Sequence, residues 1–397
     1  MAEQTAVAPS GSASFRSYFY DPRYRGIFFQ ALTLLVLIVF GWWIFQNTTA
    51  NLARSGTASG FGFLNGRAGF DIGQSLIEYN NNSTYGRAIV VGFLNTILIA
   101  VLGIVTATII GFIIGIGRLS HNWLIAKMCT VYVEIFRNIP VLLVIFFIYK
   151  AVLDTLPQVR DSIALPFHFY LNNRGLVMPK PVWGEMAWVL PVALVVAIIA
   201  TIALAYWARK RQATTGKQFH TVWAGIGLII GIPLLAFLAA GAPLTFDVPE
   251  ASRFNMRGGA RVLPEFVALY LALSLYTASF IAEVIRAGIR AVPKGQSEAS
   301  AALGIQPTTT TRLVVLPQAL RIIIPPLTSQ YLNLTKNSSL GVAVGFPELF
   351  STTSTTLNQT GQAVEAISIM LTVYLSISIA TSMFMNWFNA KMALVER

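Results

Sequence analysis

The sequence predicts an all-α polytopic membrane protein with about eight transmembrane helices. Of its 397 residues, 55% are hydrophobic and only 11% are charged, whereas a soluble domain carries about 25% charged residues to cover its surface. The apolar residues gather in runs that reach the roughly 20 residues a helix needs to cross a bilayer. Most of the net charge of +12 lies in segments on one side of these runs. A bilayer, and not water, is therefore the expected surrounding.

Apolar runs follow one another along the whole chain. The first is uncharged and exceeds the roughly 7–15 residues of a cleaved signal core, so we expect a retained anchor. The seventh is the weakest, because Pro325-Pro326 and Lys336 interrupt it. The eight runs cover residues 27–46, 88–117, 131–149, 186–207, 221–246, 266–288, 322–345 and 366–390.

The loop charges predict the orientation in the membrane. With the N-terminus in the cytoplasm, the inner segments hold 16 Lys and Arg, and the outer loops hold 10, matched by 10 Asp and Glu. Short loops such as the one with Arg209-Lys210-Arg211 favour the cytoplasmic side. This asymmetry accounts for the positive charge, so no nucleic-acid partner is expected. The outer loops 47–87 and 151–185 show no strong period and are expected to be irregular or partly helical.

Few residues suggest catalysis or metal binding. Cys129 is the single cysteine, which excludes an intrachain disulfide and a Cys-based metal site. The one Gly-Lys pair, Gly216-Lys217, lacks the P-loop pattern that binds ATP. No Ser-His-Asp or paired-carboxylate arrangement stands out, so we predict no catalytic residue, no metal and no enzyme activity. The three histidines are scattered over loops: His121, His168 and His220.

The most informative segment runs from Glu283 to Pro326 and is far less hydrophobic than its flanks. It begins with a turn at Pro293-Lys294-Gly295. Ser297 is then a candidate N-cap of a short helix, and Glu298 lies in the first turn, where the helix dipole favours an anion. Alanines and a leucine continue this helix, and Gly304 is expected to end it as a C-terminal cap.

A second short helix is expected after this glycine. Pro307 suits its first turn, and Pro317 ends or bends it. A loop with this composition can be a mere connector. However, more than thirty residues with two ordered helices exceed what joining two spans requires. The sequence therefore favours a cytoplasmic docking surface for a soluble partner.

The motif within this segment resembles the EAA loop of ABC importer permeases. In that family the pattern is Glu-Ala-Ala, three residues, Gly, nine residues and Ile-x-Leu-Pro. The matching residues here are Glu298, Ala299, Ser300, Gly304, Val314, Leu316 and Pro317. Ser300 replaces the second alanine and Val314 replaces the isoleucine, both of which are small changes.

The flanking motifs are similar to those of the polar amino-acid permeases within that family. They are the segment 133–140 (VEIFRNIP), the stretch from Tyr276 to Gln296 that leads into the loop, and Lys336-Asn337-Ser338-Ser339-Leu340. The last resembles a break in the fourth core helix. The resemblance covers residues 88–149 and 262–390, roughly half of the chain.

The resemblance implies a type I importer core of five helices with one extra N-terminal helix and a two-helix insertion. Its expected parts are a cytoplasmic tail (1–26), an anchor helix with a periplasmic loop (27–87), the permease domain (88–390) and a C-terminal tail (391–397). The permease domain would contain the insertion 153–261 and the cytoplasmic loop 284–321.

The same resemblance implies the function and the partners. The chain would form half of the path by which an ATP-driven importer brings L-amino acids across the bacterial inner membrane. Its partners would be two ATP-binding subunits, a second homologous permease in a heterodimer, a periplasmic amino-acid-binding protein and the lipid bilayer. ATP would be used by the partner ATPases, and this chain would bind no cofactor.

Several polar residues near the membrane each have two interpretations. Asn337, Ser338 and Ser339 follow the distortion expected at Pro325-Pro326, and they either line the substrate path or make a helix–helix contact. Glu283 either borders that path or pairs with Arg286 and Arg290. The candidates for the substrate path are Tyr276, Glu283, Asn337, Ser338 and Ser339.

Two further motifs have a structural interpretation. Glu134 and Arg137 are three residues apart on a helix and are expected to neutralise each other. Gly111-x-x-x-Gly115 is typical of a close helix-packing face.

Two other kinds of protein remain as alternatives. An ion-coupled transporter or channel would require several acidic groups within the membrane and no docking loop. A membrane scaffold without transport would explain the hydrophobicity but not the loop.

Overall fold

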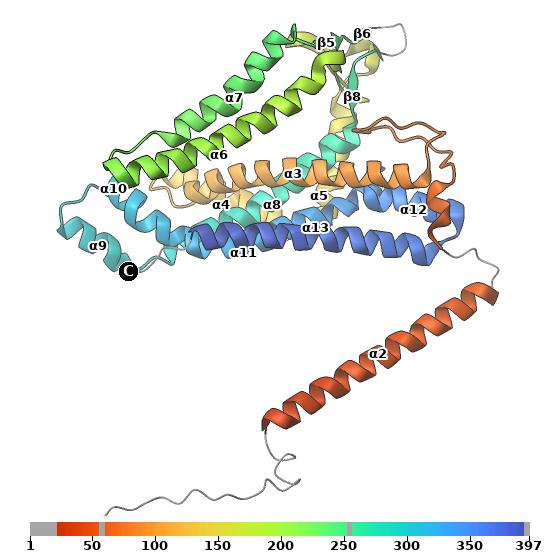
Figure 1. Cartoon of the computed structure of the whole chain (residues 1–397), viewed down its shortest axis with the longest axis horizontal. Coiled ribbons are helices and arrows are strands. Elements are labelled where there is room, and N and C mark those ends of the chain that lie inside the picture. The colour runs from red at the N-terminus through yellow and green to blue at the C-terminus, as the bar shows by residue number, and fades with distance from the viewer. Residues whose placement is uncertain (1–21, 55–59, 252–255, 393–397) are drawn as a thin grey trace, which may run out of the picture.

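The computed structural model describes residues 22–54, 60–251 and 256–392 and is predominantly helical. Figure 1 shows a bundle of four long helices, namely α3 (Tyr85–Gly117), α8 (Pro264–Arg290), α11 (Leu316–Asn337) and α13 (Ala363–Met392). A separate pair consists of α6 (Val189–Thr215) and α7 (Thr221–Ala239), with small strands near its far end. Two short helices lie at one end of the bundle, α9 (Lys294–Ala302) and α10 (Pro307–Thr310). This arrangement confirms the polytopic helical class.

Among the described residues, six helices are long and apolar enough to cross a membrane. They correspond to six of the eight apolar runs. The first is longer than its run, because the helix continues on both sides of the uncharged stretch. These helices are α2 (Pro22–Arg54), α3 (Tyr85–Gly117), α6 (Val189–Thr215), α7 (Thr221–Ala239), α8 (Pro264–Arg290) and α13 (Ala363–Met392).

The third run is a bent pair of helices. α4 (Trp123–Asn138) and α5 (Val141–Thr155) meet at an angle of 108°, with Pro140 at the bend. Proline disfavours helical backbone in the residue before it, and Ile139 is extended there. Counting this pair as one span gives up to seven spans by length and composition, one fewer than the sequence predicted.

The seventh run corresponds to α11 (Leu316–Asn337), which is not among the helices apolar enough to cross a membrane. Its polar residues lower its hydropathy, and the helix packs between α8 and α13. α11 continues through both Pro325 and Pro326. The helix changes at Ser338, where the 3₁₀ helix η6 (Ser338–Val344) begins, within the segment 336–340 that was expected to hold a break. α12 (Leu349–Thr360) follows.

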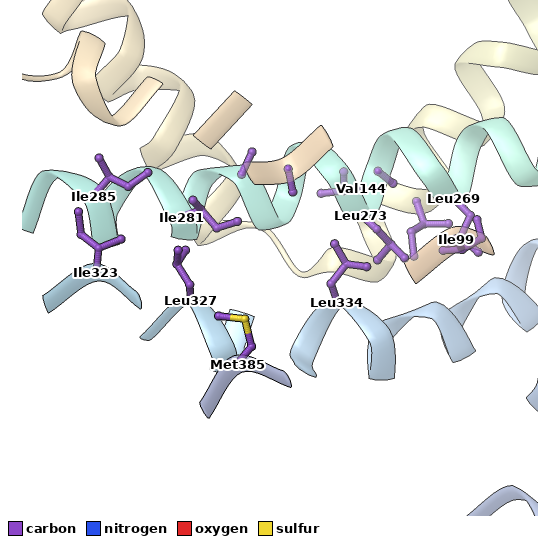
Figure 2. Close-up of a cluster of buried hydrophobic side chains, with 14 of the residues drawn as sticks. Ile99, Val144, Leu269, Leu273, Ile281, Ile285, Ile323, Leu327, Leu334 and Met385 are labelled. Carbon is purple, nitrogen blue, oxygen red and sulfur yellow. The ribbon is translucent and has the colours of Figure 1, made fainter. Parts of the chain in front are cut away.

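The hydrophobic core is organised around α8. This helix packs against α3, α4, α5 and α11. Figure 2 shows its side chains Leu273 and Ile281 among the cluster, with Ile323, Leu327 and Leu334 pointing up to it from α11. Ile99 from α3 and Val144 from α5 belong to the same cluster. Helix–helix packing of this kind holds bundles together in a bilayer, where burial from water supplies no force.

Gly111 and Gly115 bring α3 close to α8, as the Gly-x-x-x-Gly motif predicted. A β-carbon at Gly111 would lie 2.5 Å from Cγ2 of Ile281. One at Gly115 would lie 2.8 Å from the carbonyl oxygen of Ala282, which cannot rotate away. The two helices therefore contact each other through backbone and not only through side chains.

Gly115→Val is expected to prevent α3 from packing on α8 and to lower the amount of folded protein several-fold. Overpacking a tight contact costs typically about 1–3 kcal/mol, and here a backbone oxygen is in the way. The measurement is the monodisperse fraction after extraction into mild detergent. Gly227→Val in α7 is the matched control, because nothing lies within 4 Å of a β-carbon there. Equal folded fractions for the two variants would contradict the packing argument.

The insertion contains strands that the sequence did not predict. β1 (Ile163–Leu165), β2 (Phe169–Asn172), β3 (Gly175–Met178) and β8 (Ala260–Val262) form an antiparallel sheet in that order. The strands are short and mixed in polarity, so they show no clear alternation. They replace most of the irregular loop that was expected at 151–185. The connecting 3₁₀ turns are η2 (Val159–Asp161), η3 (Pro166–His168) and η4 (Glu185–Trp188).

One strand pair closes the base of the α6–α7 hairpin. β4 (Lys180–Trp183) precedes α6 and pairs with β5 (Leu244–Asp247), which follows α7. The apolar run 221–246 is therefore helical only up to Ala239, and its last residues belong to β5. A second pair joins β6 (Glu250–Ala251) to β7 (Met256–Arg257).

Candidate functional site

The loop between α8 and α11 begins with a nine-residue helix, α9 (Lys294–Ala302). Its N-cap is Pro293, so the prediction of Ser297 as N-cap is wrong. The helix starts earlier than expected, at Lys294. Pro293 suits the cap position, because its backbone is non-helical (ψ 134°) and it has no N–H group that would need a partner. Glu298 and Ala299 are exposed on α9, whereas the Ser300 side chain is buried and donates a hydrogen bond to the carbonyl of Gln296 (2.8 Å).

Gly304 ends α9 in the left-handed conformation, with φ of 70°. Its N–H donates to the carbonyl of Ala301 (2.9 Å), and the N–H of Ile305 donates to the carbonyl of Ser300 (3.0 Å). These two bonds form a Schellman motif, which satisfies the free carbonyls at a helix end. The expected C-terminal cap is therefore confirmed. Nothing lies within 4 Å of a β-carbon at Gly304, so only the backbone conformation requires glycine here.

The second helix of the loop starts at Pro307 and leads directly into α11. α10 (Pro307–Thr310) has the proline at its N-terminal turn, as expected. A π-helical turn, Thr311–Val315, joins it to Leu316, the first residue of α11. Pro317 is the second residue of α11, so the helical backbone continues through it and does not end there. The π turn is the point at which the loop meets α11.

The loop presents an apolar surface to solvent. Leu303 is 77% exposed and Leu313 is 66% exposed, on either side of the Gly304 turn. Ile305 and Leu316 are also exposed, whereas Val314 and Pro317 are half-buried. A hydrogen bond from Gln318 Nε2 to Gln296 Oε1 (3.5 Å) joins α11 to α9. The predicted motif residues are therefore brought into one continuous helix–turn–helix element.

Glu283 lies among three arginines from three helices. Arg118 at the end of α3 and Arg286 on α8 both form ion pairs with its carboxylate, and Arg286 Nε lies 3.2 Å from Oε2. Arg137 Nη1 on α4 lies 3.9 Å from the same oxygen. The sequence identified Arg286 as a partner, but Arg118 and Arg137 come from distant segments. We refer to these four residues as the Glu283 cluster.

The expected pairing of Glu134 with Arg137 is wrong within the described residues. Glu134 Oε2 accepts a hydrogen bond from Asn138 Nδ2 (3.3 Å). Arg137 turns toward α8, where its guanidinium lies 5.6 Å from the ring centroid of Phe280. An exposed ion pair between Glu134 and Arg137 would stabilise the helix by only a few tenths of a kcal/mol. The contacts of Arg137 with Glu283 and Phe280 on α8 therefore prevail.

The other candidates for the substrate path lie at two separate places. Tyr276 is half-buried on α8, with its ring 5.0 Å from that of Phe280. Asn337 is the last residue of α11, and the next two residues open η6. Ser338 Oγ donates to the carbonyl of Thr335 (2.7 Å) and Ser339 Oγ to that of Lys336 (2.8 Å). The side chains thus support the change from α to 3₁₀ helix.

Glu348 is a buried carboxylate that the sequence analysis missed. It is fully buried before α12 and accepts hydrogen bonds from the N–H groups of Phe350 and Ser351, both at 2.7 Å. Tyr374 Oη on α13 donates to it at 3.0 Å. Burial raises the pKa of Glu348 to about 7, against the three hydrogen bonds. The signal in the sequence was an acidic residue directly before a helix, which is an N-cap position.

Comparison with known families agrees with this architecture. Residues 185–394, more than half of the chain, match the family described as the binding-protein-dependent transport system inner membrane component. The matched part contains the α6–α7 hairpin, the loop with Gly304 and the helices α8 to α13.

Individual relatives extend this match over the whole chain. The general L-amino acid transport system permease protein AapQ of Rhizobium johnstonii is 67% identical over 97% of this chain and 96% of its own length. The glutamate/glutamine/aspartate/asparagine transport system permease protein BztB of Rhodobacter capsulatus is 41% identical over 95% and 96%. The glutamate/aspartate import permease protein GltK of Escherichia coli is 33% identical, with 99% of its length aligned to 62% of this chain. The chain therefore belongs to the family of inner membrane components of binding-protein-dependent transport systems.

Proposed function

We propose that this chain is the permease subunit of an ATP-driven importer for polar L-amino acids. The three relatives reported above are named for general L-amino acids or for acidic amino acids and their amides. The 67% identity over nearly the full length of AapQ favours the same class of substrate. The chain would form one half of the path, and a second homologous permease would form the other half.

One observation carries the coupling part of the proposal, namely the exposed helix–turn–helix element with apolar side chains on it. Leu303 and Leu313 project from a loop that also exposes Glu298. Exposed leucines flanked by polar residues are typical of a protein interface. An ATPase subunit would cover them and push α11 through the π turn. ATP would be bound by the ATPase subunits, since this chain has no P-loop.

The proposed arrangement in the membrane follows the loop charges. The N-terminal tail (1–26) and the loop 284–321 face the cytoplasm, and the strands of the insertion (153–261) face the periplasm. The anchor segment is 27–87, the permease domain is 88–390, and the C-terminal tail is 391–397. A periplasmic amino-acid-binding protein would deliver the substrate to the outer face.

The proposed substrate path passes the change of helix at Asn337, Ser338 and Ser339. Interrupted helices near the centre of a membrane offer backbone groups to the carboxylate and ammonium of a substrate. Tyr276 and Glu283 on α8 would border the same path further toward the cytoplasm. The ion pairs of the Glu283 cluster support a structural role for this carboxylate as well.

The purified chain alone in liposomes is expected to show no ATP hydrolysis above background and no uptake of glutamate or glutamine. Adding the second permease, the ATPase subunits and the binding protein should produce uptake that requires ATP. The measurement is accumulation of labelled amino acid with ATP or with a non-hydrolysable analogue inside the vesicles. Hydrolysis by the isolated chain, or uptake driven by an ion gradient without the ATPase, would contradict the proposal.

A further inference from the structure

Helix α2 is apolar on all sides, and the described structure shows no surface covering it. Residues 26–53 of this helix carry no charge. Each of its described side chains except that of Thr48 is exposed. Figure 1 shows α2 apart from the helix bundle. The helix either faces lipid on all sides or packs against another helix.

The bundle has an apolar groove of about 1010 Å³ between α3 and α13. Its lining on α3 begins at Ile89, near the start of that helix, and on α13 it begins at Val373, ten residues after the helix starts. Its α3 wall includes Phe93 and Val101, and its α13 wall includes Ser376, Ala380 and Phe384. Ser376 and Ala380 are one helical turn apart, and small residues at this spacing let a second helix approach closely.

The chain that follows α2 is anchored at the outer end of this groove. The N–H of Gly60 donates to Oε1 of Glu365 (2.7 Å), which lies in the first turn of α13. The 3₁₀ turn η1 (Phe61–Asn65) packs at the start of α3, where the ring of Phe63 lies 6.3 Å from that of Tyr85. Tyr85 Oη in turn bonds to Oε1 of Gln359 at the end of α12 (3.0 Å).

The short connection from α2 to this anchor limits where α2 can cross the membrane. Arg54 ends the helix, and six Cα–Cα steps lead from it to Gly60. At no more than about 3.3–3.6 Å per residue, the end of α2 lies within roughly 20 Å of Gly60. We infer that α2 packs in the groove between α3 and α13 of its own chain.

The depths of the small residues agree with this inference. Gly41 lies 13 residues from the end of α2 at Arg54, and Ala380 lies 15 residues from Glu365. At 1.5 Å per residue both are about 20 Å from their outer ends. Because the connection is short, the groove of the same chain competes for α2 at a high effective concentration. Packing in the groove of a second permease or contact with lipid alone are the alternatives.

Disulfide trapping in native membranes tests the inference. Cys129→Ala removes the single cysteine, and a protease site is placed between Arg54 and Gly60. Gly41→Cys is then combined in turn with Ser376→Cys, Ala380→Cys and Phe384→Cys. After oxidation and cleavage, the α2 fragment is expected to stay attached to the rest of its own chain in at least one pair and to separate under reduction.

The control pair is Gly41→Cys with Ile379→Cys, since Ile379 is exposed at the same depth but lies outside the groove lining. Disulfide formation there should be at least several-fold lower. Each variant is compared at equal abundance, and ATP-dependent uptake before oxidation verifies folding. A crosslink between two chains, or no crosslink above the control in any of the three pairs, would overturn the inference.

Discussion

Gly304→Asp is expected to reduce amino-acid uptake to background while the chain remains inserted and abundant. Gly304 holds the left-handed turn between α9 and α10, and a β-carbon there costs about 1 kcal/mol. The substitution also places a negative charge between the exposed Leu303 and Ile305. Both effects act on the loop outside the bilayer, so the helix core is unaffected. The lesion should therefore separate transport from folding.

The measurement combines uptake with the amount of ATPase that copurifies in mild detergent, and both are expected to fall at least tenfold. Gly216→Asp is the matched control, because Gly216 is also a left-handed helix end (φ 68°) with nothing within 4 Å of a β-carbon. It should transport normally. Glu298→Ala should be milder than Gly304→Asp, since Glu298 is exposed, and an ion pair formed near water with a basic group of the ATPase would contribute little. Normal uptake by Gly304→Asp at normal abundance would show that the loop is only a connector.

Glu283→Gln is expected to destabilise the helix bundle by about 2–3 kcal/mol. Breaking a fully buried ion pair costs about 3–5 kcal/mol, and this carboxylate is 23% exposed, so we expect less. The main cost comes from Arg118, whose side chain is only 9% exposed and would lose its counter-charge. Its Nε already has no hydrogen-bond partner within the described part of the chain.

Thermal unfolding in detergent measures this effect. Arg118→Gln combined with Glu283→Gln should recover part of the lost stability, because neither charge is then left alone. Asp154→Asn is the control, since the Lys150–Asp154 pair is exposed and should contribute less than about 1 kcal/mol.

Uptake separates the two roles proposed for Glu283. If the double variant is stable but does not transport, the carboxylate also borders the substrate path. An unchanged melting temperature for Glu283→Gln would contradict the structural role of the cluster.

The sequence predicted the features that depend on local chemistry. The apolar runs identified the long helices, and Gly304 and Pro307 identified the end and the start of the two loop helices. Gly111 and Gly115 predicted the close contact of α3 with α8. Each of these residues or runs lies within a few residues of the structural feature that it determines, so the feature can be predicted from a single sequence.

The features that the sequence could not predict depend on contacts between distant segments. Glu283 meets Arg118 and Arg137 only after three helices pack together. Helical spacing identified Arg286 correctly, but it also suggested Arg290, which forms no ion pair with Glu283 among the described residues. The strands of the insertion are two to four residues long, and β3 finds its partner β8 more than eighty residues away. α11 continues through Pro325-Pro326 because α8 and α13 support it on both sides, against the local preference of proline.

The pairing of β3 with β8 has a consequence for how this protein is assembled from parts. Met178 lies opposite Ala260 across the two antiparallel strands, so the chain leaves and re-enters at neighbouring points. Everything between these residues, including the α6–α7 hairpin, forms a cassette with adjacent ends. A two-residue reverse turn spans the gap between antiparallel strands. The geometry thus permits excision of the cassette, or its exchange for another, without moving α5 or α8.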